Sequence, residues 1–203
     1  MSTKAATSTS ASAEPALLLE GTNVALGPLQ RDLVPLYHRW DQDLAVLAGL
    51  GQRFADTLEQ SYQSYEHASN ASAREGYFTV YDIRDRDAVP YPIGTTCLQN
   101  VVRDNADFTI VLGERRGQGL GTEATRLTLD WAFNIAGLRN VALEVWAPNE
   151  AAIRAYKRAG FKEIGRRRNA ARWLGKPCDL VLMDAIPEDF TGSVITGLTD
   201  RPS

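Results

Sequence analysis

The sequence predicts an α+β fold, in which a mixed and mostly antiparallel central sheet carries helices on both faces. In the first half of the chain, runs rich in β-branched and aromatic residues follow one another with only polar turns between them, a pattern typical of antiparallel hairpins. In the second half, short strand-like runs alternate with segments of helical periodicity. Strands followed by an alternation of strands and helices favour helices packed against a single sheet.

In the first half we expect a strand, two helices and three further strands, at residues 22–29, 33–47, 57–71, 77–82, 93–102 and 106–112. Both helical segments carry apolar residues at helical spacing. Asp32 and Asp56 stand at the expected N-cap positions, where a carboxylate accepts hydrogen bonds from the free N–H groups of the first turn.

The second half begins with a helix that Gly137 ends. Five residues form its apolar stripe: Leu120, Ala124, Leu127, Trp131 and Ile135. A strand at 141–146, a helix at 150–159 and strands at 161–168 and 178–186 complete the expected order. The helix at 150–159 is expected to stop at Gly160.

The length of 203 residues favours one domain, because two ordinary domains would each have too little chain for a core. The Ser-, Thr- and Ala-rich residues 1–16 are expected to form a disordered tail. A single domain is expected at 17–190, followed by a flexible C-terminal tail at 191–203.

Charge and cysteine content exclude several classes of function. A formal net charge of -3 argues against a nucleic-acid binder, which needs a strong basic field, and suits an amine substrate better. The two cysteines, Cys97 and Cys178, lie far apart without histidines at metal-ligand spacing, so we expect no metal site and a reducing, cytoplasmic setting. No apolar run approaches the ~20 residues of a membrane span, so no membrane association is expected.

The most informative stretch is "GERRGQGLGTEATRLTLDWAF", residues 113–133, in which three alternating glycines precede a helix. Such a loop presents free N–H groups and the positive end of the helix dipole, which together suit a phosphate group. The spacing is neither the GxGxxG of a dinucleotide fold nor a P-loop. A tight strand-to-helix turn that needs its glycines for packing alone is the alternative interpretation.

Two motifs in this chain resemble the signatures of the Gcn5-related N-acetyltransferases (GNAT). "RGQGLGTEA" matches the family's R/Q-x-x-G-x-G/A signature, and "LEVWAPNEAAIRAYKRAGF" is similar to its second signature. The resemblance covers residues 106–186 well, the N-terminal half loosely, and is nearest to the branch of ribosomal-protein N-terminal acetyltransferases. It implies a sheet that is splayed apart at an acyl-CoA site, with acetyl-CoA as co-substrate; homodimers are common among such folds.

The resemblance also implies which residues bind the coenzyme. Backbone groups of Val111 and Leu112 would pair with the pantetheine arm, and the amides from Gln118 to Thr122 would hold the pyrophosphate. The expected binding residues are Val111, Leu112, Arg116, Gly117, Gln118, Gly119, Leu120, Gly121, Thr122, Asn149 and Tyr156.

Acyl transfer to an amine needs a base, because an alkylammonium has a pKa near ~10, and an acid for the departing thiolate. Glu144 on a central strand and Tyr156 on the following helix are the best pair available, and relatives in the ribosomal-protein branch use an equivalent glutamate as base and tyrosine as acid. Asp107 is a reserve base. The alternatives are a solvated strand residue for Glu144 and a packing aromatic for Tyr156. Thr109 stands where the family's strand has glycine, which affects the acceptor channel.

The sequence therefore predicts an acetyl-CoA-dependent N-acetyltransferase that acylates a primary amine of a small molecule, such as a metabolite or an antibiotic-like compound. A protein N-terminus is the alternative acceptor. A binding protein that keeps the acyl-CoA fold as a sensor without turnover is the alternative of another class.

Overall fold

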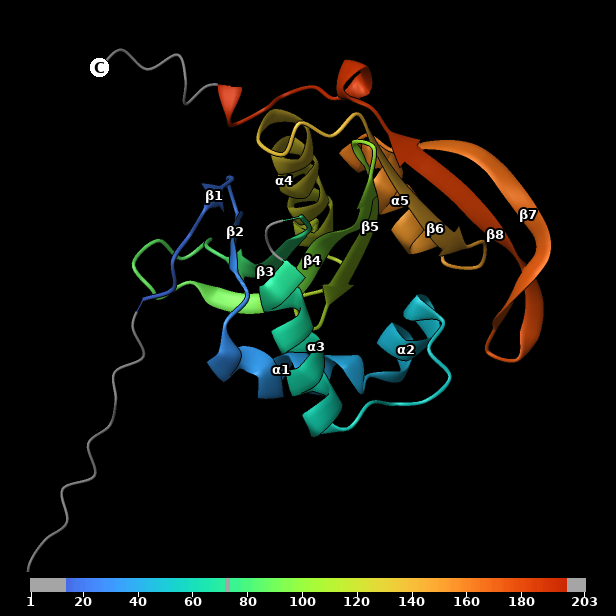
Figure 1. The fold of residues 1–203 in the computed structure, drawn as a ribbon, viewed down its shortest axis with the longest axis horizontal. Coiled ribbons are helices and arrows are strands. Elements are labelled where there is room, and N and C mark those ends of the chain that lie inside the picture. The colour runs from blue at the N-terminus through green and yellow to red at the C-terminus, as the bar shows by residue number, and fades with distance from the viewer. Residues whose placement is uncertain (1–13, 72–73, 197–203) are drawn as a thin grey trace, which may run out of the picture.

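The computed structural model describes residues 14–71 and 74–196, which form one eight-stranded sheet in the order β1-β2-β3-β4-β5-β6-β8-β7 (Figure 1). All neighbouring strands are antiparallel except β5 and β6, which are parallel. The strands are β1 (Leu19–Glu20), β2 (Val24–Pro28), β3 (Gly76–Asp82), β4 (Tyr91–Val102), β5 (Asn105–Leu112), β6 (Asn140–Trp146), β7 (Lys162–Trp173) and β8 (Lys176–Ala185). The α+β class and the mixed sheet predicted from the sequence are confirmed.

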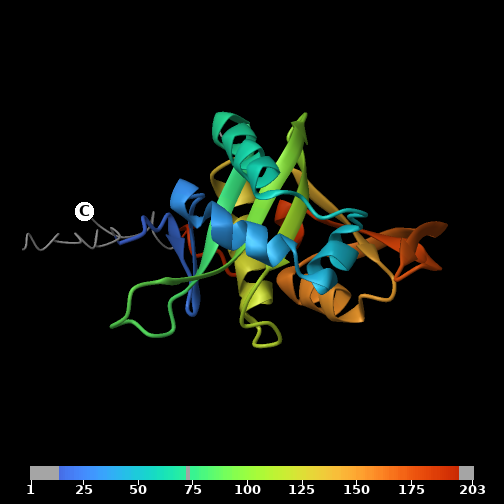
Figure 2. The ribbon, with the colours of Figure 1, turned by 90° about the horizontal axis from the view of Figure 1, so that it is seen from below.

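Five α-helices cover the two faces of this sheet. They are α1 (Val34–Asp41), α2 (Leu44–Leu50), α3 (Leu58–Ala71), α4 (Leu120–Asn134) and α5 (Glu150–Ala159), with short 3-10 turns at Arg31–Leu33 and Pro187–Asp189. Figures 1 and 2 show α3 on one side of the sheet and α4 on the other. Strand alternation produces these two faces: Phe78 and Val80 of β3 pack with α4, whereas the hydroxyl of Thr79 lies 2.6 Å from that of Tyr37 in α1.

The main core lies between the sheet and the pair α4 and α5. It includes Val141, Leu143 and Val145, the alternate residues of β6, together with Val181 and Met183 of β8. A second cluster joins β2, β3 and β4 to the N-terminal half of α4. The main core anchors β6 and α5, and it leaves the remaining alternate residues of β6 on the opposite face of the sheet.

The predicted helix at 33–47 is in fact two helices. α1 ends at Asp41, and Asp43 begins α2 with extended backbone and a side chain that accepts a hydrogen bond from the N–H of Ala45 at 2.7 Å. Asp32 does not cap α1, because Leu33 occupies that position without a side-chain hydrogen bond. The apolar spacing continues across the break and therefore hid it.

The cap of α3 also differs from the prediction. Thr57, and not Asp56, begins the helix: its hydroxyl accepts from the N–H of Gln60 at 3.2 Å, while its own N–H donates to the side chain of Gln60 at 2.7 Å. This reciprocal arrangement is a capping box. Because Thr57 caps the helix, the side chain of Asp56 does not cap α3 and faces the surface between α1 and α3.

The last two strands are longer than predicted and form a hairpin that projects beyond the body of the molecule (Figure 1). Leu174 and Gly175 make its turn with φ of 47° and 81°, as a two-residue hairpin turn requires. Most of β7 is exposed. Its arginine-rich sequence lacks the alternation of a half-buried strand, which is why the prediction ended at residue 168.

Residues 191–196, expected to begin a flexible tail, contact α4. The fully buried carboxylate of Asp130 accepts hydrogen bonds from the Ser193 hydroxyl at 2.6 Å and from the N–H groups of Val194 and Ile195 at 2.7 and 3.3 Å. The side chain of Ile195 is buried in the second core cluster. Residues 1–13 and 197–203 of the predicted tails lie outside the described residues.

Candidate active site

A cleft opens in the middle of the sheet because β5 and β6 pair along only three residues each. Residues 105–107 pair with 140–142, and beyond them the two strands diverge. The resulting cleft has a volume of ≈ 560 Å³. Its walls are the second half of β5, the second half of β6, the N-terminal end of α4, and one side each of α2 and α5. This is the splayed sheet that the resemblance implied.

The ladder between β4 and β5 decides which backbone groups face the cleft. The N–H of Gly113 donates to the carbonyl of Ile93 in β4 at 2.9 Å, and the carbonyl of Val111 lies close against Gly94. Because the backbone groups of successive residues point to opposite sides of a strand, those of Val111 point toward β4. This geometry corrects the expectation that Val111 offers its backbone to a ligand, although Val111 lines the cleft.

The same alternation turns the backbone groups of Ile110 and Leu112 toward the cleft. The carbonyl of Leu112 accepts a hydrogen bond from Nε of Arg116 at 2.6 Å, and the same guanidinium forms an ion pair with Asp43 at 3.0 Å. Arg116 therefore ties the start of α2 to the end of β5 at the mouth of the cleft. On this side β5 pairs with β6 only as far as Asp107, so within the described residues no strand of the sheet lies beside Ile110 and Leu112 here.

The glycines of the loop serve two different purposes. Gly117 and Gly119 have φ of 78° and 83°, a conformation that disfavours other residues, and an added Cβ at either would meet no atom within 4 Å. Gly121 has no such constraint, but a Cβ there would lie 2.8 Å from the side chain of Leu112. The packing interpretation therefore holds for Gly121, whereas the open backbone around Gly117 and Gly119 leaves room for a ligand.

The N-terminal end of α4 presents free N–H groups. Within the part of the chain that the structure describes, no group accepts a hydrogen bond from the N–H groups of residues 118–121. The N–H of Thr122, which was also expected to bind phosphate, donates to the carbonyl of Gly119 at 3.0 Å. Free N–H groups at the start of a 15-residue helix suit an anion, because the helix dipole adds to their partial charges.

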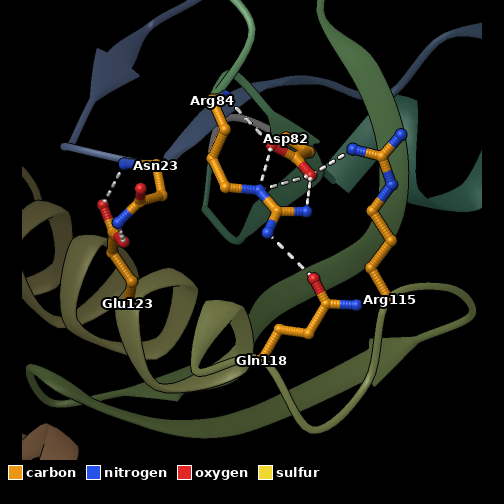
Figure 3. Close-up of polar contacts among 6 residues, drawn as sticks. All are labelled: Asn23, Asp82, Arg84, Arg115, Gln118 and Glu123. Atoms are coloured by element: carbon orange, nitrogen blue, oxygen red, sulfur yellow. Dashed lines mark hydrogen bonds and ion pairs between the residues drawn. The ribbon is translucent and has the colours of Figure 1, made fainter.

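Behind the loop lies a charged network that the sequence patterns did not reveal (Figure 3). The buried carboxylate of Asp82 at the end of β3 binds Arg84 at 2.6 Å and also pairs with Arg115 of the loop. Arg84 in turn donates to the side chain of Gln118 at 2.9 Å. Burial alone would raise the pKa of Asp82, but hydrogen bonds from Arg84 and Arg115 hold it well below its usual range. Asp82 therefore anchors the loop from beneath.

The two candidate bases lie on the same face of the sheet. Asp107 is the register partner of Ala142, and Glu144 follows two residues later on β6, so both side chains point away from the core that contains Leu143. Both line the cleft. Glu144 is about half exposed and lies 3.6 Å from Arg167 of β7, whereas Asp107 accepts a hydrogen bond from the side chain of Asn100 at 3.0 Å.

Tyr156 lines the cleft from α5, with its ring packed at right angles against that of Phe108 and near that of Phe161. Burial raises the pKa of Tyr156 to about 12, so its hydroxyl stays protonated at neutral pH, as a proton donor must. Asn149, which also lines the cleft, caps α5 by accepting from the N–H of Ala152 at 3.3 Å. Its expected place at the start of the helix is confirmed.

The structure brings the predicted site residues together around one cleft. Eight of them line it: Asp107, Val111, Leu112, Arg116, Gly121, Glu144, Asn149 and Tyr156. The others form the loop and the first turn of α4 beside it: Gly117, Gln118, Gly119, Leu120 and Thr122. The prediction did not name Ile110, Trp146 or the individual α2 residues that line the cleft. The break before Asp43, which orients α2, was the signal that could have placed these α2 residues.

Among residues 14–71 and 74–196, no group of three or more His, Cys, Asp or Glu side chains is arranged to hold a metal ion. None of the helices in this part of the chain has the length and apolar character to cross a membrane.

Curated proteins similar to this chain include acetyltransferases with different acceptors. Alpha/beta-tubulin-N-acetyltransferase 9 of Mus musculus is 27% identical over 160 residues, which is 72% of this chain and 65% of the mouse protein. Spermidine N(1)-acetyltransferase of Escherichia coli is 27% identical over 150 residues, or 70% of this chain and 75% of that protein. The chain thus spans just under two thirds of the mouse relative.

Solved structures share the fold over most of the chain. A spermidine N-acetyltransferase from Vibrio cholerae, in complex with CoA and spermine, superposes with a TM-score of 0.75 at 21% identity, covering 84% of this chain and 99% of that one. A ribosomal-protein-S5-alanine acetyltransferase from Vibrio fischeri gives 0.71 at 18% identity, covering 86% and 98%.

The family model described as an acetyltransferase (GNAT) domain matches residues 23–162, well over half of the chain. This match begins just before β2 and ends at the start of β7, so it includes the cleft, the glycine loop and α5. The residues that carried the resemblance in the sequence surround one splayed cleft in the structure. The chain therefore belongs to the family of GNAT-domain acetyltransferases.

Proposed function

We propose that the protein transfers the acetyl group of acetyl-CoA directly to a primary amine of a small molecule. One observation carries the proposal: a single cleft joins the free N–H groups at the start of α4 to the sheet face that bears Glu144 and Asp107. An anion site and a pair of carboxylates at two ends of one cleft suit a reaction between a phosphate-bearing donor and a cationic acceptor. The E. coli relative named for spermidine, which is such an acceptor, supports a small amine.

The coenzyme binds along the glycine loop and β5. The N–H groups of residues 118–121 hold the pyrophosphate, and Asp82, through Arg84 and Arg115, keeps the loop in place. The backbone of Ile110 on the cleft side of β5 pairs with an amide of the pantetheine arm in the way a further strand would. The N–H of Leu112 polarises the thioester carbonyl and stabilises the negative charge that develops on its oxygen.

The reaction needs a base for the amine and an acid for the thiolate. An alkylammonium with a pKa near ~10 must lose a proton before its nitrogen can attack, and Glu144 accepts it, directly or through water. Attack by the neutral nitrogen on the thioester carbonyl forms the C–N bond and the tetrahedral intermediate, and collapse of this intermediate breaks the C–S bond. The hydroxyl of Tyr156 supplies the proton that the departing sulfur takes up, and the second proton that the nitrogen loses on becoming an amide restores the hydroxyl.

The test is thiol release from acetyl-CoA with a panel of small amines and short peptides. Glu144→Gln should lower kcat by roughly 10² to 10⁴ while leaving the affinity for acetyl-CoA nearly unchanged. Asp107→Asn is the matched control, because it removes the same charge from the same face of the sheet. If Asp107→Asn lowers kcat more than Glu144→Gln does, Asp107 is the base and Glu144 is not. Absence of amine-dependent thiol release from a protein that binds acetyl-CoA would contradict the proposal and favour a sensor.

A protein N-terminus is the second candidate acceptor, and one feature favours it. A groove of ≈ 1140 Å³ lies between α2 and the end of the β7–β8 hairpin, and Trp146 lines both this groove and the cleft. An extended peptide could lie in the groove with its terminal amine at the cleft. Faster reaction of peptides than of small amines in the same panel would select this acceptor. The relative named for tubulin is consistent with it.

A further inference from the structure

A second cavity of ≈ 310 Å³ lies on the acceptor face, under α1 and α3, and we call it the acceptor cavity. It adjoins the cleft, because Leu50, Thr109 and Val111 line both. The register of the sheet gives the distance between them. Cys97 and Gln99 of β4 line the acceptor cavity, and their partners on β5 are Thr109 and Asp107 of the cleft. Since paired strands lie ~5 Å apart, the acceptor cavity begins about one strand spacing from the cleft.

The charged lining of the acceptor cavity is acidic. Asp41 at the end of α1 and Asp56 before α3 both line it. Across residues 14–71 and 74–196, no lysine or arginine forms an ion pair with either carboxylate. Burial and, to a smaller extent, repulsion from Asp56 together raise the pKa of Asp41 to about 6, although His38 acts in the opposite direction. The cavity thus holds negative charge that the described part of the protein does not neutralise.

The other walls of the acceptor cavity carry aromatic rings that suit the methylene groups and the cationic nitrogen of an alkylamine chain. Rings of Tyr37, Tyr65 and Tyr77 line the cavity. The hydroxyl of Tyr37 is bonded to Thr79, and that of Tyr77 donates to Glu75 at 2.6 Å, so internal partners occupy these two polar groups. What their rings offer a ligand is their apolar faces, which attract cations and pack against methylene groups.

We propose that the acceptor cavity binds a second, cationic nitrogen of the acceptor, so that the preferred substrates are diamines or longer polyamines. This inference rests on the proposed function and specifies its substrate class. The carboxylates alone would not define a site; the proposal depends on a cavity, lined by aromatic rings, at a fixed distance from the reacting face. One nitrogen lies at the cleft near Glu144, the methylene chain crosses β5 at Thr109, and the second nitrogen lies near Asp41 and Asp56.

The experiment compares two acceptors of nearly equal length, 1,4-diaminobutane and 4-amino-1-butanol, which differ only in the charge of the distal group. The wild-type protein should acetylate the diamine with a kcat/KM at least tenfold higher. Asp41→Asn and Asp56→Asn should each lower kcat/KM for the diamine by roughly tenfold to a hundredfold, as expected for a partly buried charge pair, and leave the amino alcohol unchanged. Glu59→Gln is the control, because Glu59 carries the same charge nearby on α3 but does not line the cavity.

Calorimetric titration with acetyl-CoA first shows that each variant is folded and binds the donor. Equal kcat/KM for the two acceptors, or equal losses in Glu59→Gln and Asp41→Asn, would overturn the second-nitrogen site and leave the proposed acetyl transfer standing. If no amine reacts, the proposed function fails, and titration of 1,4-diaminobutane into the CoA complex then decides the site alone. If the wild-type protein binds 1,4-diaminobutane and Asp41→Asn abolishes this binding, the second-nitrogen site is retained. If the wild-type protein does not bind 1,4-diaminobutane, the site is refuted.

Discussion

Replacing Asp82 by asparagine tests whether the network beneath the glycine loop stabilises the fold and the coenzyme site. The carboxylate is almost fully buried, with 1% of its side chain exposed, and it accepts hydrogen bonds from Nε, Nη2 and the backbone N–H of Arg84 and from Arg115. Asparagine keeps the shape but loses the charge and one acceptor oxygen. Two guanidinium groups then face a neutral amide.

The expected loss follows from these contacts. Removing one partner of a buried ion pair costs about 3–5 kcal/mol. Arg84 and Arg115 remain 40% and 37% exposed, so water compensates part of this, and we expect a loss of about 3 kcal/mol in the free energy of unfolding at pH 7. For a chain of this size the melting temperature should fall by roughly 6–12 °C. Because Arg84 also holds Gln118, the dissociation constant for acetyl-CoA should rise as well.

The assay is urea and thermal unfolding of the wild-type protein, of Asp82→Asn, and of Asp87→Asn, which removes an exposed carboxylate from the same turn. The pKa of Asp82 is lower in the folded state, so its contribution is complete above the unfolded value near ~4 and is lost as the pH falls below it. The difference between wild type and Asp82→Asn should therefore shrink in acid. A loss below ~1 kcal/mol at pH 7, or a difference independent of pH, would refute the reasoning.

Three further predictions concern other parts of the chain. Gly119→Ala should raise the dissociation constant for acetyl-CoA at least tenfold in calorimetry. The control Gly175→Ala introduces the same ~1–2 kcal/mol of strain at a similar positive φ in the distant hairpin turn and should leave that constant unchanged. Equal effects of the two substitutions would exclude a phosphate site at Gly119. Asp41→Asn should raise the free energy of unfolding at pH 8 by roughly 1–3 kcal/mol, because the raised pKa of Asp41 means that its ionised form destabilises the folded state. This gain should disappear between pH 6 and pH 4, where the wild-type carboxylate becomes protonated. A gain that persists at pH 4 would contradict the buried charge. Asp130→Asn should lower the free energy of unfolding by about 2 kcal/mol and speed proteolysis near residue 193, because the single oxygen of asparagine cannot accept all the hydrogen bonds that the carboxylate accepts. An unchanged urea unfolding curve would count against this anchor.

The helix at 150–159 shows why parts of this fold were predictable. Asn149 and Gly160 mark its ends, and both act through contacts within a few residues, so the local sequence contains the necessary information. The glycines before α4 are similar, because a positive φ is a property of the backbone at that residue. The break between α1 and α2 was missed because the apolar spacing continues through it while the turn depends on packing against β5.

By itself, the sequence determined the α+β class, the order of most strands and helices, and two motifs with their chemistry, because each depends on residues near one another along the chain. Only the tertiary structure showed that Asp82 supports the loop, that Val111 turns its backbone to β4, and that Asp41 and Asp56 line one cavity. These facts depend on strand register and on contacts between segments tens of residues apart. The face on which a side chain lies, and what it meets there, is decided when the sheet forms and the helices pack on it.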